Sequence, residues 1–114
     1  MEETLFDKIL AGEIPADVAY EDENVLAFHD ISPQAPVHVL VIPKQKISRF
    51  QHLPEAETQQ VGLLFQTAAK VARKLGLEEN GYRVVVNNGS YGQQTVEYIH
   101  LHLLGERQMQ WPPG

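Results

Sequence analysis

The chain contains no cysteine, and this absence removes several classes of chemistry. There can be no disulfide, no thiol nucleophile and no thiolate zinc site, and thiol redox chemistry does not fix the compartment. Positive charge is also scarce, since 9 Lys and Arg face 15 Asp and Glu, for a formal net charge of −6. Nucleic acids and anionic membranes are bound mainly by clustered basic side chains, so we expect neither as a partner. A few backbone N–H groups and imidazoles can still hold one phosphate.

Long apolar runs are lacking as well. No stretch reaches the roughly 20 residues of a membrane-spanning helix. The acidic start MEETLFDKIL has neither the basic nor the apolar region of a secretory signal. We therefore expect a cytoplasmic protein. The 114 residues, 43% of them hydrophobic, suffice for a single domain over 1–114, without a linker, a repeat or a low-complexity tract.

Short segments with strand or helix patterns follow one another along the chain. Thr4 and Asp7 form a capping-box pattern before a short amphipathic helix that ends at Gly12. We expect a hairpin from strands at 18–21 and 25–29, a buried central strand at 37–43, and further strands at 82–87 and 95–105. Between them, residues 54–76 carry apolar side chains at helical spacing: Val61, Leu64, Phe65, Ala68, Ala72 and Leu75. Leu63 should point away from this stripe, as a surface leucine or a subunit contact. The order predicts an α+β domain with a short and a long helix on a mainly antiparallel sheet of about five strands.

The last predicted strand carries two histidines two residues apart, in the stretch YIHLHLLG at 98–105. Side chains alternate across a strand, so Tyr98, His100 and His102 should share one face, while the apolar residues between them face the long helix. Such a pair can be structural. It also suits zinc, if a third histidine completes the site. The candidates for that third ligand are His29, His38 and His52, with His38 placed at the start of the central strand.

Phosphoryl chemistry is the third interpretation of this pair. An imidazole attacks phosphorus well when one ring nitrogen is held as N–H and the other is free. A second imidazole can bind the phosphoryl oxygens or protonate the leaving group. The polar loop NNGSYGQQT at 87–95 leads directly into the strand and offers backbone donors with the side chains of Asn87, Gln94 and Thr95. It is the combination of loop and strand that favours a function over a structural role.

These residues resemble a known family. The segment GQQTVEYIHLHLLG resembles the signature of the histidine-triad (HIT) superfamily, whose motif is His-x-His-x-His. The segments TLFDKI, EIPA, AFHDISPQAPVHVLVIPK, GYRVVVNNGS and RQMQWPPG resemble its histidine-triad nucleotide-binding (HINT) branch, over nearly the whole chain. The resemblance implies an α+β HIT fold and a homodimer whose two sheets join into one. It also implies binding of purine nucleoside monophosphates and hydrolysis of purine nucleoside phosphoramidates, without a cofactor or catalytic metal.

The resemblance also implies roles for individual residues. His100 matches the nucleophile that forms a nucleotidyl-histidine, His102 the triad histidine that contacts the phosphate, and His38 an additional active-site histidine. Polar groups around the phosphate and leaving group correspond to Thr95, Asn87 and Gln94. Asp30 corresponds to the carboxylate that holds the ribose hydroxyls. The groups near the base or sugar correspond to Phe6, Phe28 and Ile31. The group near the leaving-group side corresponds to Trp111.

The chain departs from the family motif at its first position, where Tyr98 replaces histidine. If that position acts through its backbone carbonyl, which accepts the ring N–H of the nucleophile, any residue can serve. A phenol, however, cannot supply imidazolium charge near a phosphate, so we expect weakened but not abolished catalysis. Lys46 and Glu106 also depart from the pattern, and Glu97 should face the long helix or lie at the sheet margin. The alternative is a purine nucleotide-binding or dimeric interaction protein with little turnover, and the third hypothesis is a metal-dependent hydrolase built on His38, His100 and His102.

Overall fold

The first element is the short helix that the capping pattern predicts. In the computed structural model, which describes residues 2–114, α1 spans Leu5–Leu10. Both halves of the capping box form, because the Asp7 carboxylate accepts from the Thr4 N–H at 2.7 Å and Thr4 Oγ1 accepts from the Asp7 N–H at 3.3 Å. Phe6 is the buried residue of this helix. The cap thus fixes where α1 starts and turns Phe6 inward.

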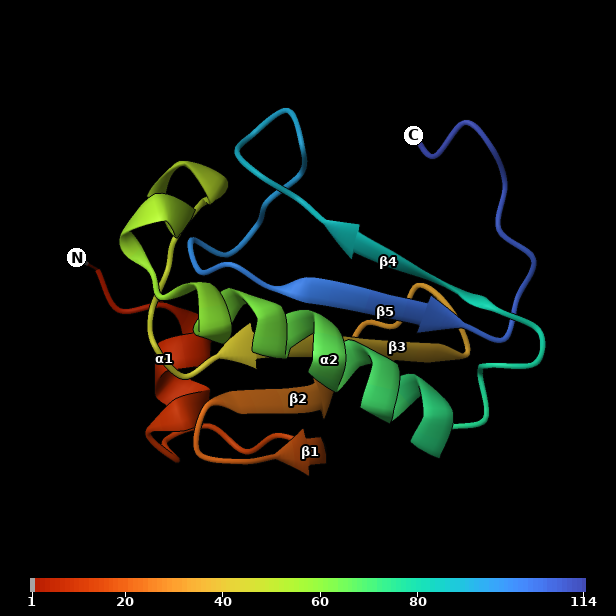
Figure 1. Cartoon of the computed structure of the whole chain (residues 1–114), viewed down its shortest axis with the longest axis horizontal. Coiled ribbons are helices and arrows are strands. Elements are labelled where there is room, and N and C mark those ends of the chain that lie inside the picture. The colour runs from red at the N-terminus through yellow and green to blue at the C-terminus, as the bar shows by residue number, and fades with distance from the viewer. Residues whose placement is uncertain (1) are drawn as a thin grey trace.

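Five strands form one antiparallel sheet in the order β1-β2-β3-β5-β4 (Figure 1). Their bounds are Val18–Glu21 (β1), Val25–His29 (β2), Val37–Pro43 (β3), Tyr82–Val86 (β4) and Leu101–Gly105 (β5). The predicted hairpin of β1 and β2 is confirmed, and β3 is the central strand, buried from His38 onward. The α+β class with a five-stranded antiparallel sheet is therefore confirmed.

The long helix α2, Thr58–Lys74, covers one face of the sheet (Figure 1). Its buried side chains Leu64, Ala68 and Val71 pack on a cluster that also holds Leu101 and Leu103 of β5. The prediction that the apolar face of the last strand meets this helix is confirmed. Two details were wrong. Phe65 lies outside the buried stripe and is 53% exposed, whereas Leu63 flanks the stripe and packs against the core.

The predicted start of the long helix was also too early. Residues Phe50–Glu55 form a separate 3₁₀ helix, η1, with Pro54 inside it. Ala56 and Glu57 are extended, with ψ angles of 156° and 133°, so no helical hydrogen bonds run from η1 into α2. The apolar residues keep a helical spacing across this break, but the helical conformation of the backbone is interrupted.

The opposite face of the sheet carries a second apolar cluster under α1. Its members are Phe6, Leu26, Phe28, Leu40, Ile42 and Tyr98. Alternate residues of β2 and β3 belong to the two clusters, as the strand period requires. This second face is the one onto which the histidines of β3 and β5 project.

The last strand begins later than predicted, at Leu101 instead of residue 95. Leu101 is paired with Val41 of β3 and with Val86 of β4. The ladder with β3 does not extend further toward Pro43, because proline has no N–H to donate. Tyr98 and His100 therefore stand in an irregular segment that leads into β5. Glu97 is exposed beside this segment, where its carboxylate pairs with Arg49 at 2.9 Å, so it lies at the margin of the sheet and not under α2.

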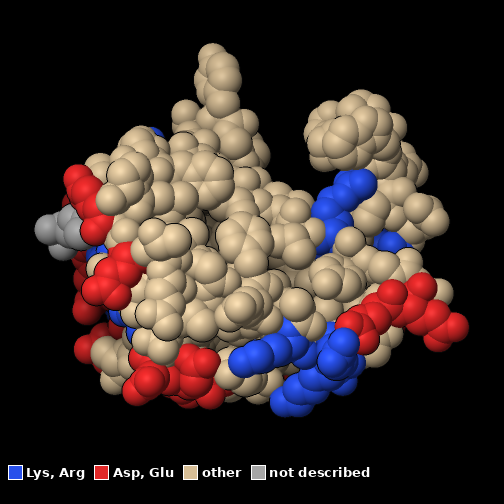
Figure 2. Space-filling model, viewed as in Figure 1, with Lys and Arg blue, Asp and Glu red and all other residues tan. Residues whose placement is uncertain are grey.

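The charged side chains on the face that α2 covers lie around its margins, with acidic and basic groups both present (Figure 2). Among residues 2–114, no helix has the length and apolar character that crossing a bilayer requires.

Packing at the end of β5 gives a stability prediction. A Cβ added at Gly105 would lie 2.7 and 2.8 Å from the two Cδ atoms of Leu77, whose side chain is buried. We expect Gly105→Ala to lower the free energy of unfolding by about 1–3 kcal/mol, the usual range for overpacking. Gly62→Ala is the matched control, since open space surrounds that helical position and alanine should raise stability by up to about 1 kcal/mol. Urea denaturation measures both, and a neutral Gly105→Ala would show that Leu77 can move aside.

Candidate active site

Three imidazoles gather on the α1 side of the sheet. His38 comes from β3, His102 from β5 and His100 from the segment just before β5. The register pairs His38 with Leu104 and Leu40 with His102, so the two strand histidines are diagonal neighbours on one face. His38 Nε2 lies 2.9 Å from His102 Nδ1, and the ring centroids of His100 and His102 are 4.8 Å apart. The fold thus brings together three of the predicted residues. His29, opposite Val39, belongs to the α2 side, and His52 lies half-exposed in η1.

The proton on His100 is located by its hydrogen bond. Its Nδ1 lies 2.7 Å from the backbone carbonyl oxygen of Tyr98. A carbonyl only accepts, so Nδ1 carries the hydrogen and the neutral ring has its lone pair at Nε2. The residue is 4% exposed, and the Phe6 ring stands at 86° to the imidazole with centroids 5.0 Å apart. This is the arrangement of an imidazole prepared as a nucleophile.

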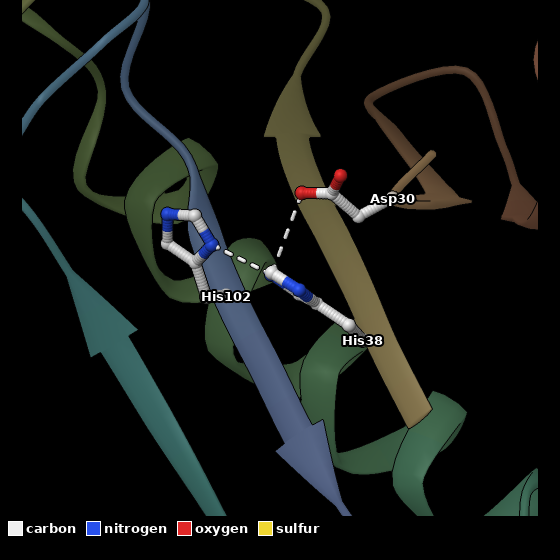
Figure 3. A group of neighbouring side chains, drawn as sticks. All are labelled: Asp30, His38 and His102. Carbon is white, nitrogen blue, oxygen red and sulfur yellow. Dashed lines mark hydrogen bonds and ion pairs between the residues drawn. The ribbon is translucent and has the colours of Figure 1, made fainter. Parts of the chain in front are cut away.

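A chain of hydrogen bonds locates the protons on the other two rings, and Figure 3 shows its link between His38 and His102. The Gln34 backbone N–H donates to His38 Nδ1 at 3.0 Å, so the neutral His38 ring carries its hydrogen at Nε2. That Nε2–H donates to His102 Nδ1, which leaves His102 with its hydrogen at Nε2. His102 Nε2 is buried and has no hydrogen-bond partner within residues 2–114. A donor in this state is a site for an acceptor such as a phosphoryl oxygen.

Burial keeps all three rings uncharged. It lowers the pKa of His102 to about 4, with repulsion from His100 and His38 acting in the same direction. Burial also lowers the pKa of His100, against the opposing effects of the Tyr98 carbonyl and Asp30. The pKa of His38 is lowered by burial too, although the Asp30 carboxylate raises it in part. At neutral pH the cluster therefore offers a lone pair at His100 and an N–H donor at His102.

Asp30, His38 and His102 also have the composition of a metal site, because their ligand atoms lie within 4.8 Å of one another. The hydrogen bonds work against that use. His38 Nε2 carries a proton as long as the Gln34 N–H occupies Nδ1, and a metal ligand needs a lone pair there. His38 Nε2 also lies 3.5 Å from Asp30 Oδ2 (Figure 3). The three residues are thus arranged as a proton-ordered hydrogen-bond chain, and a cation would have to displace the His38 proton.

The predicted ribose and base contacts lie beside this chain. Asp30 follows β2, and its Oδ1 accepts from the Ser32 N–H at 2.8 Å. Phe6 and Phe28 are buried and pack edge to face with centroids 5.6 Å apart, which gives the site a rigid aromatic floor. Ile31 is 95% exposed on the following loop. Its side chain is free to cover a bound base or sugar.

The polar loop at 87–95 is held by Gln94. Its Oε1 accepts from the Gly89 N–H at 2.8 Å, and its Nε2 donates to the carbonyls of Ser48 and Val96 at 2.7 and 3.1 Å. Both amide hydrogens are thus engaged within the protein, and Gln94 shapes the loop instead of presenting donors to a ligand. Asn87, half-buried, and Thr95, exposed, stand at the two ends of the loop. Thr95 also lines a groove of about 710 Å³ that runs between the start of α1 and residues 46–52.

Trp111 is 80% exposed, and the Arg83 guanidinium of β4 lies over its ring at 5.8 Å from the centroid. Arg83 also donates to the Gln110 carbonyl at 3.0 Å, so the tail is anchored on β4.

Two hydrogen bonds to backbone groups at the site were not predicted from sequence. The Gln34 N–H sets the proton of His38, and the Pro43 carbonyl accepts from the Tyr98 phenol. Both act through backbone atoms, so residue type carries no signal for them. The Gln34 carbonyl in turn accepts from Arg107 Nε at 3.0 Å, which ties the loop to the segment after β5.

The lowered pKa values predict how stability depends on pH. Below their ordinary pKa of 6.5, the three histidines take up protons more readily in the unfolded chain than in the fold, because burial lowers the pKa of each, that of His102 to about 4. The unfolded state then binds more protons, so the free energy of unfolding should fall between about pH 6.5 and about pH 4 and be level just above that window. His102→Asn removes one such group and should flatten the fall, whereas His52→Asn, at a half-exposed position, should not. Urea denaturation across this range measures the slope, and an unchanged slope in His102→Asn would contradict the prediction.

Several known proteins and solved structures are similar to this chain. The HIT domain family model matches residues 11–109. A maize (Zea mays) protein named 14 kDa zinc-binding protein is 54% identical over 113 residues, covering 97% of this chain and 88% of the relative. The crystal structure of a HIT family hydrolase from Legionella pneumophila has a TM-score of 0.94 at 51% identity and covers 98% of this chain and 100% of that one. A HIT family hydrolase from Clostridium thermocellum has a TM-score of 0.91 at 44% identity, covering 96% of both chains. The chain therefore belongs to the HIT domain family, with the fold of the HIT family hydrolases.

Proposed function

We propose that the chain hydrolyses purine nucleoside phosphoramidates, such as adenosine monophosphate joined to an amine, through a nucleotidyl-histidine intermediate on His100. The observation that carries the proposal is the state of the His100 ring. Nδ1–H is held by the Tyr98 carbonyl at 2.7 Å, so the lone pair sits at Nε2. The unpartnered His102 Nε2–H beside it supports the same chemistry, because a phosphoryl oxygen can accept from it. The hydrolase names of the two solved relatives agree with this reaction class.

The reaction has two steps. In the first, the His100 Nε2–P bond forms and the P–N bond to the amine breaks, while solvent water supplies the proton that the amine nitrogen takes up. In the second, water adds to phosphorus, the Nε2–P bond breaks, and the proton from water balances the one that the amine took up. His102 holds a phosphoryl oxygen in both steps, and His38 keeps the His102 hydrogen at Nε2. His102 and His38 both stay neutral. The phosphoryl oxygen is therefore stabilised by a correctly placed N–H donor and not by imidazolium charge.

The substrate contacts follow from the same placement. Asp30 is proposed to hold the ribose hydroxyls, and the base lies over Phe6 and Phe28 with Ile31 above it. Asn87 lies on the phosphate side. Thr95 faces the leaving amine, for which the adjoining groove provides room. Trp111 is proposed to lie on the leaving-group side, with the Arg83 guanidinium over its ring. Gln94 shapes the loop without contacting the substrate, because both its amide hydrogens are bonded within the protein.

A direct test follows hydrolysis of an adenosine phosphoramidate of a simple amine. We expect His100→Ala to lower kcat by roughly a thousandfold or more, as the loss of a nucleophile does. Mass spectrometry of the quenched wild-type chain should detect one added nucleotidyl group, absent in His100→Ala. His52→Ala is the matched control, since it removes a histidine outside the cluster. Full activity in His100→Ala would contradict the proposal. Monophosphate binding by a wild-type chain without turnover would support the alternative of a nucleotide-binding or interaction protein.

The name of the maize relative raises the question of zinc. A chelator added to the same assay answers it. We expect activity to be unchanged, because the His38 proton occupies the position that a metal would need. Loss of activity on chelation, restored by added zinc, would instead support a metal-dependent hydrolase.

We also propose a homodimer in which β4 of each subunit extends the sheet of the other. Within the described part of the chain, β4 is a sheet edge that pairs only with β5, and Tyr82 and Val84 on it are more than one-third exposed. Light scattering should give twice the chain mass of 12.8 kDa. Val84→Lys should shift this mass toward one chain, and Val18→Lys on the opposite edge strand β1 is its control. Cytoplasmic location stays a prediction from composition, as does the absence of nucleic-acid and membrane partners.

A further inference from the structure

Besides a local bond from its N–H, Tyr98 makes two hydrogen bonds, one through its backbone carbonyl and one through its phenol. Its backbone carbonyl accepts the His100 Nδ1–H at 2.7 Å, and its phenol donates to the backbone carbonyl of Pro43, the last residue of β3. The side chain is 0% exposed and packs edge to face with Phe6, with centroids 5.8 Å apart. The phenol therefore lies in the core beneath α1, where it cannot act as a neighbour of a bound phosphate.

The carbonyl on which His100 depends lies outside the sheet. The ladder of β5 begins at Leu101, three residues later, and the Tyr98 N–H makes a local bond to Val96 O at 2.8 Å. The peptide unit after Tyr98 is held by the Ile99 N–H, which donates to Ile47 O at 2.6 Å. The second contact is the hydrogen bond from the Tyr98 phenol to the Pro43 carbonyl. Both acceptors belong to the end of β3 and the residues just after it, so two contacts replace the missing ladder.

We propose that Tyr98 is a positioning residue for His100. By binding the Pro43 carbonyl, its phenol fixes the Tyr98 carbonyl, which orients the imidazole and keeps its lone pair at Nε2. The part that concerns phosphorus rests on the proposed function, whereas the hold on the His100 ring does not. An imidazole at position 98 is shorter than a phenol and would leave the Pro43 carbonyl without this donor. On this proposal Tyr98 supports the nucleophile. The sequence-based expectation of weakened catalysis had assumed that the phenol lies near the phosphate.

The test deletes the phenol oxygen alone. Tyr98→Phe and Tyr98→His are compared with the wild-type chain. Tyr20→Phe in β1 is the matched control, because it also loses a phenol hydrogen bond, to Asp22 at 2.9 Å. ¹⁵N NMR of the imidazoles reports the His100 tautomer and the exchange of its Nδ1–H with water. In Tyr98→Phe we expect this exchange to rise and kcat to fall, each by roughly three- to tenfold, the factor for one neutral hydrogen bond, with KM little changed. Tyr98→His should lower kcat as well, and Tyr20→Phe should change neither quantity.

The proposal would be overturned if Tyr98→Phe kept the wild-type kcat and the wild-type rate of exchange of the His100 Nδ1–H with water. A kcat above the wild-type value in Tyr98→His would overturn it as well. If the wild-type chain does not hydrolyse the phosphoramidate, the proposed function fails, while the NMR comparison still decides whether Tyr98 holds the ring. If Tyr98→Phe does not fold, the wild-type chain provides the test. Burial raises the pKa of Tyr98, so this phenol should stay protonated above about pH 10, where a free phenol ionises, and its hydroxyl proton should exchange slowly. Ionisation of Tyr98 near that pH, or a rapidly exchanging hydroxyl, would overturn the anchor.

Discussion

The pairing of β3 with β5 is the constraint on which the site depends. It places His38 opposite Leu104 and His102 opposite Leu40, so both imidazoles project to the α1 side and meet at 2.9 Å. Slipping this register by one residue would turn the histidines of one strand toward α2 and break the contact. The register is held because Val39, Val41, Leu101 and Leu103 fill the opposite face against α2. The apolar core on one side of the sheet thus aligns the polar cluster on the other.

Hydrogen-bond direction gives the cluster its chemistry. Each ring has one nitrogen occupied by a backbone group or by a neighbouring ring, and the proton positions follow from that occupation. The Gln34 amide acts on His38, and His38 acts on His102. The rings are buried and uncharged, so a lone pair and an N–H can be offered side by side without mutual repulsion. Neutral imidazoles in a fixed order suit attack on phosphorus better than a charged pair would, because a protonated His100 has no lone pair.

The irregular segment before β5 shows how a site can be set just outside a sheet. Strand geometry would have aligned Tyr98, His100 and His102 in one row. Because the ladder stops at Leu101, the Tyr98 carbonyl is instead available to His100, and the phenol turns down to Pro43. A carbonyl that already accepts a hydrogen bond in a strand ladder would be less available to the His100 Nδ1–H.

Much of this architecture was contained in local sequence patterns. The capping box of α1, the hairpin, the central strand, and the split of β5 into a helix-facing and a histidine-bearing side all follow from residue spacing, because period and capping are local properties. Spacing alone left His29, His38 and His52 as candidate partners for the pair, and the active-site role of His38 came from the family resemblance. The separation of η1 from α2, the exposure of Phe65, the start of β5 at Leu101 and the engagement of Gln94 within its own loop did not follow. They depend on which backbone groups find partners among residues far away in the chain. For the same reason, sequence by itself determined which imidazoles are present and which face they share. Only the tertiary structure decided where their protons lie, because the Gln34 N–H and the Tyr98 carbonyl that fix those protons are backbone groups, which nearly every residue type would supply.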